Sequence, residues 1–334
     1  LALADDGYDA EKASGAVLQL ATKDRAFAIF GGVGTPTIVK ALPVVLKLNK
    51  SEGLFYFANF TGAQPQREPP FDAVVLNVRA SYRQETKAMV DAFVGMGRKK
   101  IGIYVQDDAF GASGRDGVKR ALQDHGLAVV ADTTYPRGQK YDVSVAPQVK
   151  ILQQAGVDAI VSVGAYQACA ALVRDARAAG LSVPIHNVSF VGADQMLELL
   201  REEEKKSGAK LLANLVTKSL PAVKEYRAAM EKYRPGVPGG VGDGQYKPAA
   251  TFSFGSLEGF VSAKAFLAVL AKAGPNPTRQ GFFSAAEGMG SFDLGLGVPA
   301  QFSPTRHQAL DKVWFTYATP SGWMATNDPK AVVK

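Results

Sequence analysis

The sequence predicts an α/β fold made of two doubly wound lobes. Apolar runs of strand length alternate with segments of helical periodicity along most of the chain, and most of these runs are continuous, as expected for strands buried on both faces. Strict alternation of this kind favours parallel sheets joined by right-handed crossovers. The chain has 334 residues, 47% of them hydrophobic, which is enough for about two domains. Roughly twelve alternating elements also exceed what one mononucleotide-binding half contains.

The expected elements follow in order along the chain. The apolar runs predict strands at residues 27–30, 54–57, 74–78, 101–105, 127–131, 159–163, 185–191 and 211–216. Helical periodicity between these runs predicts helices at residues 9–23, 37–48, 84–96, 111–125, 143–155 and 166–179. The later part is expected to contain helices at 222–233 and 256–273, a flexible Pro/Gly-rich loop at 235–242, and a last strand at 313–317.

Charge and cysteine content narrow the function classes. Lys plus Arg total 38 against 31 Asp plus Glu, but the basic residues are spread along the chain, so we do not expect nucleic-acid binding. The single cysteine, Cys169, lies among alanines and is predicted to be a buried structural thiol without a disulfide partner in the chain. The histidines at positions 125, 186 and 307 have no metal-ligand spacing, and we expect neither a metal nor a cofactor.

No uninterrupted apolar stretch reaches the length of a membrane span. The segment at residues 257–270 is interrupted by Glu258 and Lys264, so the chain as given is expected to be soluble. The chain opens on LALADD, which resembles the end of a strand. No signal peptide is visible, and we expect an upstream segment to have been removed.

Three loops between a predicted strand and a predicted helix carry small and hydroxyl-bearing residues. The clearest spans residues 30–37, where three glycines allow close backbone approach to a ligand. Thr35 is expected to cap the following helix and Pro36 to take its first position, which leaves backbone N–H groups free to bind a carboxylate or another anion. The other two loops span residues 57–62 and 163–167. These loops indicate binding rather than bond cleavage.

Seven short segments carry a family resemblance. They are DDGYD at residues 5–9, the loop at 30–37, FTGA at 60–63, NVRASY at 77–82, QDDAFG at 106–111, ARAAGL at 176–181 and SLEG at 256–259. In this order and spacing, over nearly the whole chain, they resemble the type I periplasmic solute-binding proteins of ABC importers, in the leucine/isoleucine/valine-binding branch.

The resemblance implies the fold and the working context of the protein. It implies two Rossmann-like lobes joined by three hinge crossings, the periplasmic binding protein-like I fold, with lobe 1 at residues 1–82 and 218–304 and lobe 2 at 83–217 and 305–334. Such proteins hold a small polar solute in a cleft between the lobes and close on it by a hinge motion. The implied partner is the membrane permease of an ABC importer, and the implied state is a monomer, periplasmic or lipid-anchored outside the cytoplasm. The family's first strand and first helix precede the DDGYD segment, where this sequence has only LALA.

The resemblance also carries the family's ligand contacts onto this chain. The implied contacts are Gly34, Thr35, Thr37, Phe60 and Thr61 in lobe 1, with Tyr82, Arg83, Asp108, Tyr166 and Phe190 at the first crossing and in lobe 2. A purely structural role is the alternative for these residues: Thr35 would then only cap its helix, and Phe60 and Phe190 would only fill the core. Arg79 and Arg83 can add a contact to a carboxylate, or lie solvated near the hinge. A shared place at strand ends favours a binding site, because open α/β sheets bind ligands there.

The position of Phe190 bears on the kind of ligand. Amino-acid binders of the branch that this chain resembles hold the substrate ammonium with an acidic residue at this strand end. A buried ammonium without an acidic partner costs several kcal/mol. An organic or aromatic acid therefore competes with a branched-chain amino acid as the expected ligand. Asp107 and Asp108, in a neighbouring loop, are alternative sources of the acidic group.

Other functions require motifs that the sequence lacks. A nucleotide-dependent dehydrogenase needs GxGxxG, which Gly31, Gly32 and Gly34 do not form, and no GxxxxGK[ST] phosphate loop occurs. The GxSxG elbow of a serine hydrolase is also absent from the sequence. The sequence therefore predicts a binding protein rather than an enzyme. A ligand-sensing receptor domain of the same fold stays open as an alternative, because it would use the same cleft.

Overall fold

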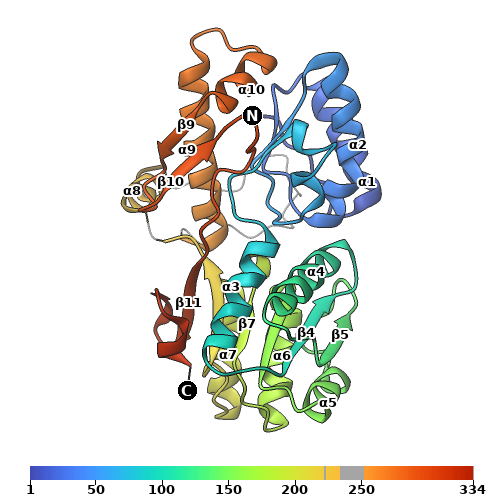
Figure 1. Cartoon of the computed structure of the whole chain (residues 1–334), viewed down its shortest axis with the longest axis vertical. Helices are drawn as coiled ribbons and strands as arrows, with labels where there is room; N and C mark the ends of the chain where they lie inside the picture. The colour runs from blue at the N-terminus through green and yellow to red at the C-terminus, as the bar shows by residue number, and fades with distance from the viewer. Residues whose placement is uncertain (222, 234–251, 334) are drawn as a thin grey trace. The chain divides into compact units, whose positions relative to one another are not determined.

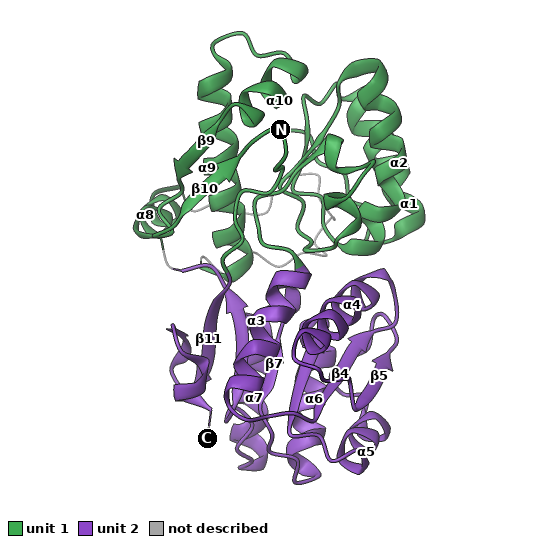
Figure 2. Cartoon of the chain, viewed as in Figure 1, with its two compact units in different colours: residues 1–81, 222–312 green, residues 82–221, 313–334 purple. Residues whose placement is uncertain are grey.

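The structure is a computed structural model that describes residues 1–221, 223–233 and 252–333. The chain forms two compact units, shown in Figure 2: unit 1 comprises residues 1–81 and 222–312, and unit 2 comprises residues 82–221 and 313–334. The chain therefore passes from one unit to the other three times. The α/β class with three crossings is as predicted, and the loop expected at residues 235–242 lies outside the described residues.

The first segment of unit 1, residues 1–81, forms a small parallel sheet and two helices (Figure 1). Its strands are β1 (Ile29–Phe30), β2 (Tyr56–Phe57) and β3 (Val75–Leu76), in the order β1-β2-β3. Helix α1 (Ala10–Leu18) continues into a π-helical segment, η1 (Gln19–Lys23), and α2 (Thr35–Glu52) follows β1. All three strands are shorter than the apolar runs that predicted them, and residues 1–6 form no strand.

The second segment of unit 1 adds helices and a hairpin. Its elements are α8 (Lys224–Tyr233), α9 (Phe254–Ala273), α10 (Arg279–Glu287) and the antiparallel pair β9 (Gly290–Asp293) and β10 (Pro299–Phe302). Helix α10 and the two strands were not predicted, and strands of four residues carry too little periodicity to be seen in the sequence.

Helix α9 is the one helix in the described part of the chain that is long and apolar enough, by length and composition, to cross a membrane. It begins with a capping box between Ser253 and Ser256. Its residues Leu257, Val261 and Val269 are buried within the chain. These observations describe α9 as a packed helix of unit 1.

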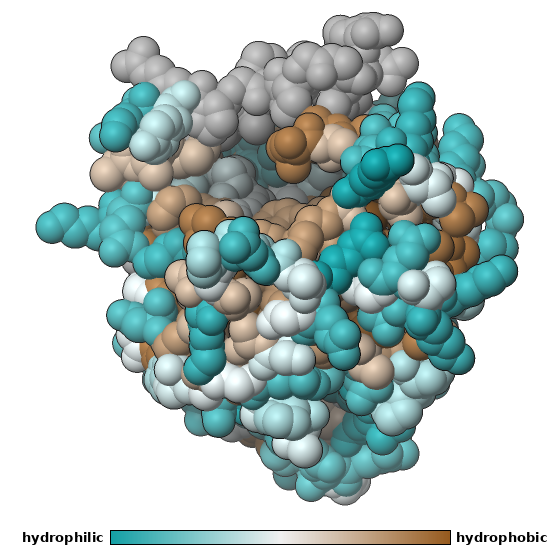
Figure 3. Space-filling model, turned by 90° about the horizontal axis from the view of Figure 1, so that it is seen from above, coloured by the Kyte–Doolittle hydropathy of each residue, from teal (hydrophilic) through white to brown (hydrophobic). Residues whose placement is uncertain are grey.

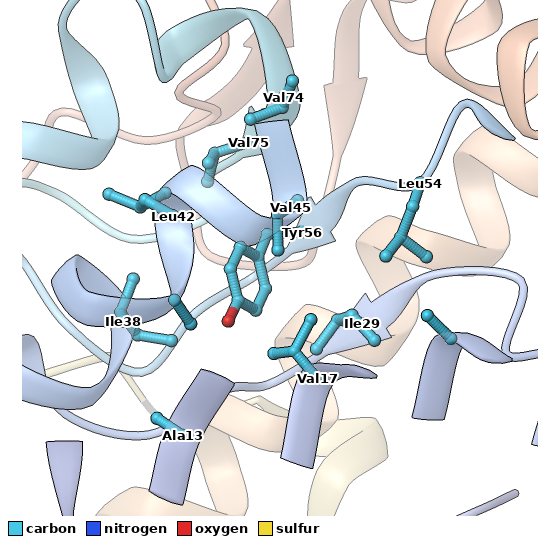
Figure 4. Close-up of a cluster of buried hydrophobic side chains, with 12 residues drawn as sticks. Ala13, Val17, Ile29, Ile38, Leu42, Val45, Leu54, Tyr56, Val74 and Val75 are labelled. Carbon is cyan, nitrogen blue, oxygen red and sulfur yellow. The ribbon is translucent and has the colours of Figure 1, made fainter. Parts of the chain in front are cut away.

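A hydrophobic cluster joins the sheet of unit 1 to its first helices (Figure 4). Its buried members come from α1, η1, α2 and the strands with their flanks: Ala13, Val17, Ala21, Ile29, Ile38, Ala41, Leu42, Val45, Leu54, Tyr56, Val74 and Val75. Aromatic contacts attach the second segment of unit 1. Phe55 stacks on Phe282 of α10 with ring centroids 5.3 Å apart, and Phe57 meets Phe266 of α9 edge-on at 5.1 Å.

Unit 2 is built on a seven-stranded sheet with the order β12-β11-β8-β7-β6-β4-β5. The parallel strands are β4 (Ile101–Gln106), β5 (Ala131–Tyr135), β6 (Ala159–Val163), β7 (Ile185–Asn187) and β8 (Leu215–Ser219). The helices are α3 (Tyr82–Gly95), α4 (Ala109–Asp124), α5 (Ala146–Gln154), α6 (Tyr166–Ala178) and α7 (Ala193–Ser207). The chain leaves the neighbouring strands β4 and β6 toward opposite edges of the sheet, so the strand order reverses between them.

Several expectations for unit 2 are corrected by the structure. The strand predicted at 127–131 instead begins at Ala131. β5 is a half-buried edge strand, and its polar residues Asp132, Thr133 and Thr134 do not form an apolar run. The strand predicted at 185–191 ends at Asn187, and a 3-10 turn, η4 (Ser189–Val191), follows it. The strand predicted at 211–216 starts only at Leu215.

The expectation of purely parallel sheets is also wrong at one edge of unit 2. The strand predicted at 313–317 is β11 (Trp314–Thr319), which runs antiparallel to β8 and pairs with β12 (Gly322–Thr326) in a hairpin. An antiparallel edge strand on a mostly parallel sheet is a common arrangement. The alternation of strands and helices stops before this region, so it carried no signal for the hairpin.

Hydrophilic side chains cover most of the face seen in Figure 3, with apolar side chains gathered toward its middle. The large exposed hydrophobic residues of unit 1 include Phe30, Val33 and Leu267. Single exposed apolar residues of this kind are normal on a protein surface. Leu267 therefore offers an exposed leucine for comparison with the buried ones.

Truncating Leu42, which is 0% exposed in α2, should destabilise unit 1. We expect Leu42→Ala to lower the free energy of unfolding by about 2–5 kcal/mol, because it removes buried methyl groups and leaves a cavity. Leu267→Ala is the matched control and should change it by less than about 0.5 kcal/mol. Guanidinium denaturation followed by far-UV circular dichroism measures both. Equal effects of the two substitutions would contradict the assignment of Leu42 to the core.

Candidate functional site

The loop between β1 and α2 is shaped by Gly34. This residue is the N-cap of α2 with φ 95°, a conformation that favours glycine. A Cβ atom at this position would lie 1.8 Å from the ring of Tyr8. Thr35 and Pro36 are the first two helical residues, so the predictions that Thr35 caps the helix and that Pro36 is its first residue are wrong. The backbone at the start of α2 has no side-chain cap.

Two predicted contact residues meet through their hydroxyl groups. Thr35 Oγ1 and Thr61 Oγ1 lie 2.7 Å apart, and both side chains are buried. Thr61 Oγ1 also accepts a hydrogen bond from the backbone N–H of Ala63 at 3.2 Å. The hydroxyl of Thr37 is used differently, because it donates to the carbonyl oxygens of Gly34 and Val33, the two residues just before the helix. The structure thus brings Thr35 and Thr61 together and turns Thr37 inward.

A network of amides fixes the loop that carries Thr61. Gln66 Nε2 donates to the Thr61 carbonyl at 2.9 Å, and Asn59 Nδ2 donates to Gln66 Oε1 at 2.9 Å. Arg67 Nη1 donates to the Ala63 carbonyl at 2.7 Å. Asn59, Gln66 and Arg67 were not predicted as site residues, because a polar residue in a loop gives no sign of which carbonyl group it will contact. Their contacts hold the loop in one conformation.

Phe60, the fifth predicted residue of unit 1, lies beside a buried arginine. The Arg79 guanidinium carbon is 5.1 Å from the centroid of the Phe60 ring. Arg79 Nη1 lies 3.3 Å from Glu258 Oε1 of α9, and the Arg79 side chain is 6% exposed. Arg79 is therefore part of the interior of unit 1, and the alternative of a solvated hinge arginine is wrong.

In unit 2 a pocket lies at the carboxyl ends of the strands, where the sheet order reverses. It has a volume of about 110 Å³ and is lined by Gln106, Tyr135, Gly138, Gln139, Lys140, Ala165, Tyr166, Gln167 and Ala168. The Tyr135 hydroxyl donates to Gln106 Oε1 at 3.3 Å and accepts from the Ala165 N–H at 3.0 Å. Burial holds the pKa of Tyr135 well above its ordinary value, so the phenol stays protonated and keeps its donor. Tyr166 is the predicted residue at this pocket.

The predicted aromatic residues of unit 2 lie close to one another. The rings of Tyr82 and Phe110 have centroids 5.3 Å apart, and those of Phe110 and Phe190 lie 4.9 Å apart. A Cβ atom built on Gly192 would lie 3.5 Å from Tyr166 Cβ, so the turn that carries Phe190 packs against Tyr166. We call Tyr82, Phe110, Tyr166 and Phe190 the aromatic group. Phe110 was not among the predicted contact residues.

Asp108 and Arg83 are already engaged in structural contacts. Asp108 is the N-cap of α4: its Oδ1 accepts from the Phe110 N–H at 2.8 Å, and its Oδ2 accepts from Gln106 Nε2 at 2.6 Å. Arg83 Nε lies 2.7 Å from Asp116 Oδ2. A Cβ atom at Gly111 would lie 1.8 Å from the Gln106 carbonyl oxygen. The QDDAFG segment therefore has a clear structural role in starting α4.

The chain resembles known proteins over almost its full length. A family model described as periplasmic binding protein matches residues 1–322, while no curated protein matches the chain. Among solved structures, a possible leucine/isoleucine/valine-binding protein from Rhodopirellula baltica SH 1 is 29% identical with a TM-score of 0.83, over 99% of this chain and 85% of that chain. These findings confirm the predicted resemblance. The family and its structural relatives are solute-binding proteins and receptors rather than enzymes.

Two more distant structures share the fold. A branched chain amino acid ABC transporter protein from Thermus thermophilus with bound valine is 14% identical, with a TM-score of 0.77, over 97% of this chain and 83% of that chain. A fatty acid ABC transporter substrate-binding protein from Thermomonospora curvata is 21% identical, with a TM-score of 0.77, over 98% of this chain and 80% of that chain. At these identities the likeness shows the fold alone.

The single cysteine should be unreactive in the native protein. Cys169 is buried in α6, it accepts a hydrogen bond from Ser162 Oγ at 3.2 Å, and burial raises the pKa of its thiol to about 12. Because the thiolate is the reactive species, we expect an aromatic disulfide reagent at pH 8 to modify Cys169 only after the protein is unfolded with guanidinium. Spectrophotometric titration of released thiolate measures this. Full modification of the native protein within minutes would contradict the burial.

Proposed function

Because the chain belongs to the periplasmic binding protein family, we propose that it is the substrate-binding component of an ABC importer and captures a small carboxylate-bearing solute. Members of this family are extracytoplasmic proteins that bind small molecules. In this proposal the partner is the importer's membrane permease, and the protein acts as a monomer. The supporting observation is that five of the ten predicted contact residues lie in two groups. They are Thr35 with Thr61 in unit 1, and Tyr82, Tyr166 and Phe190 in unit 2.

The group in unit 1 suits the carboxylate end of a solute. The start of α2 lacks a side-chain cap, and a helix N-terminus favours negative charge. The paired hydroxyls of Thr35 and Thr61 share one hydrogen bond, so the other proton is left to donate to an acceptor. Backbone N–H groups and a hydroxyl are donors that a carboxylate accepts readily.

The aromatic group in unit 2 suits an apolar solute body. The family resemblance implies that Phe190 takes the position of the acidic residue of amino-acid binders, and the Phe190 ring packs on Phe110. Asp108 uses both carboxylate oxygens to cap α4 and to bind Gln106. We therefore propose a hydrophobic or aromatic acid without an α-ammonium group as the solute. Of the distant relatives, one is a fatty acid transporter protein and one binds valine, so the fold accommodates both classes.

Matched pairs of acids test the proposed solute class. We expect 3-phenylpropanoate to bind at least about tenfold tighter than phenylalanine, and 4-methylpentanoate tighter than leucine. Each amino acid adds only an ammonium, and both carboxylate oxygens of Asp108 are already engaged. Isothermal titration calorimetry measures the affinities after a thermal-shift screen, in which a solute at about 100 times its dissociation constant adds about 2.7 kcal/mol of stability. Tighter binding of the amino acids would refute the solute class. A shift with NAD or ATP alone would refute solute binding.

Removing the Thr61 hydroxyl should weaken binding of the solute identified in that screen. We expect Thr61→Val to reduce the binding free energy by about 1–3 kcal/mol, because a buried acceptor on the solute loses its donor. Thr133→Val is the matched control, since the Thr133 hydroxyl is also buried but donates to the Ile103 carbonyl at 2.7 Å within the sheet of unit 2. Calorimetric titration of both variants measures the difference. Unchanged affinity in Thr61→Val would remove Thr61 from the site.

A further inference from the structure

A buried carboxylate in unit 2 holds the turn that carries Phe190. Glu85 lies in the first turn of α3 and is 3% exposed. Its two oxygens accept hydrogen bonds from one residue: Oε2 from the backbone N–H of Ser189 and Oε1 from the Ser189 hydroxyl, each at 2.8 Å. Hydrogen bonds to a carboxylate are about twice as strong as neutral ones. Because both bonds go to one residue, they fix the orientation of η4 as well as its position.

The turn η4 determines where two residues of the aromatic group lie, Phe190 and Tyr166. Ser189 is the first residue of η4, so the Phe190 side chain leaves the backbone one residue after the contact with Glu85. Phe190 then packs on Phe110. Gly192, with φ 73°, ends the turn against Tyr166. A change in η4 would therefore displace Phe190 and alter the packing of Tyr166.

A buried lysine on β8 lies within electrostatic reach of Glu85. Lys218 on β8 is 2% exposed, and its Nζ lies 3.0 Å from the centroid of the Phe315 ring. Within the described residues this Nζ has no hydrogen-bond partner. Burial holds the pKa of the Lys218 amine well below its ordinary value, and the negative charge of Glu85 opposes this shift only in part.

We propose that Glu85 is a positioning residue for solute binding, which fixes η4 so that Phe190 presents its ring to the apolar part of the solute. The inference rests on the proposed function, because it assigns Glu85 a role in supporting Phe190. In this proposal buried Glu85 contributes to solute binding as well as to the stability of the fold. Affinity for an aromatic acid then depends on Glu85, although Glu85 acts through the turn.

The first test observes Phe190 directly and needs no ligand. With 4-fluorophenylalanine incorporated at position 190, fluorine NMR should give one sharp resonance in the parent protein. Glu85→Ala removes both bonds to Ser189, and we expect a shifted, broadened or split resonance. Glu85→Gln keeps an oxygen for the Ser189 N–H and an N–H for its hydroxyl, so it should restore the single resonance.

A second carboxylate in unit 2 provides the matched control. Glu204 Oε1 also accepts from two backbone groups, the Leu211 N–H at 2.6 Å and the Leu212 N–H at 3.2 Å. Glu204→Ala therefore removes a comparable contact in a segment that does not carry Phe190. We expect it to lower stability while leaving the fluorine resonance at position 190 unchanged.

Affinity for 3-phenylpropanoate gives the second readout. We expect Glu85→Ala to bind at least about tenfold more weakly, Glu85→Gln to stay within about threefold of the parent, and Glu204→Ala to match the parent. Ser189→Ala keeps the backbone bond and loses the hydroxyl bond, so it should fall between the parent and Glu85→Ala. This variant carries the test if Glu85→Ala does not fold.

The outcomes separate this inference from the proposed function. An unchanged resonance and unchanged affinity in Glu85→Ala, or in Ser189→Ala where it replaces Glu85→Ala, would overturn the positioning role. Equal losses in Glu85→Ala and Glu204→Ala would overturn it too, since general stability would then explain both. If the parent protein binds none of the acids, the proposed function fails, and the fluorine spectra alone decide whether Glu85 fixes Phe190.

Discussion

A parallel strand that is buried on both faces can present polar side chains to a solute only at its ends. This constraint determines where the candidate site residues lie in the chain. All six residues of β4 and all five of β6 are buried, so these strands bring polar side chains to a pocket only at their ends, as Gln106 does at the end of β4. Groups that meet a solute must collect where the strands end and the helices begin. In unit 1 this places Thr35 and Thr61 together, and in unit 2 it places Tyr135 beside Tyr166. Two sheets of different size thus present similar strand–helix junctions.

The sequence predicted the elements best where the signal is local. The strand predicted at 159–163 matches β6, and α6 begins at Tyr166 as predicted, because a fully apolar run leads directly into an amphipathic helix. Prediction failed where partners distant in sequence decide the structure. β5 reads ADTTY and is a strand because it pairs with β4 at the sheet edge. The β11–β12 hairpin likewise owes its place to pairing with β8.

The sequence indicated which residue types belong to the candidate site more readily than it indicated which residues they contact. The glycine and hydroxyl pattern indicated Thr35, but its partner Thr61 lies 26 positions away and is reached only through the pairing of β1 with β2. Glu85 and Ser189 are 104 positions apart, and no local pattern connects them. The capping role of Asp108 was also invisible, because an aspartate before a helix looks the same whether it binds a ligand or the helix.

The single cysteine of this chain has a practical consequence. Because Cys169 is enclosed in α6 and carries a strongly raised pKa, the native protein offers no accessible thiol. A cysteine engineered at a surface position would then be the one attachment point for a thiol-directed dye. The wild-type background is thereby suited to building an optical biosensor, with no need to replace its own cysteine first.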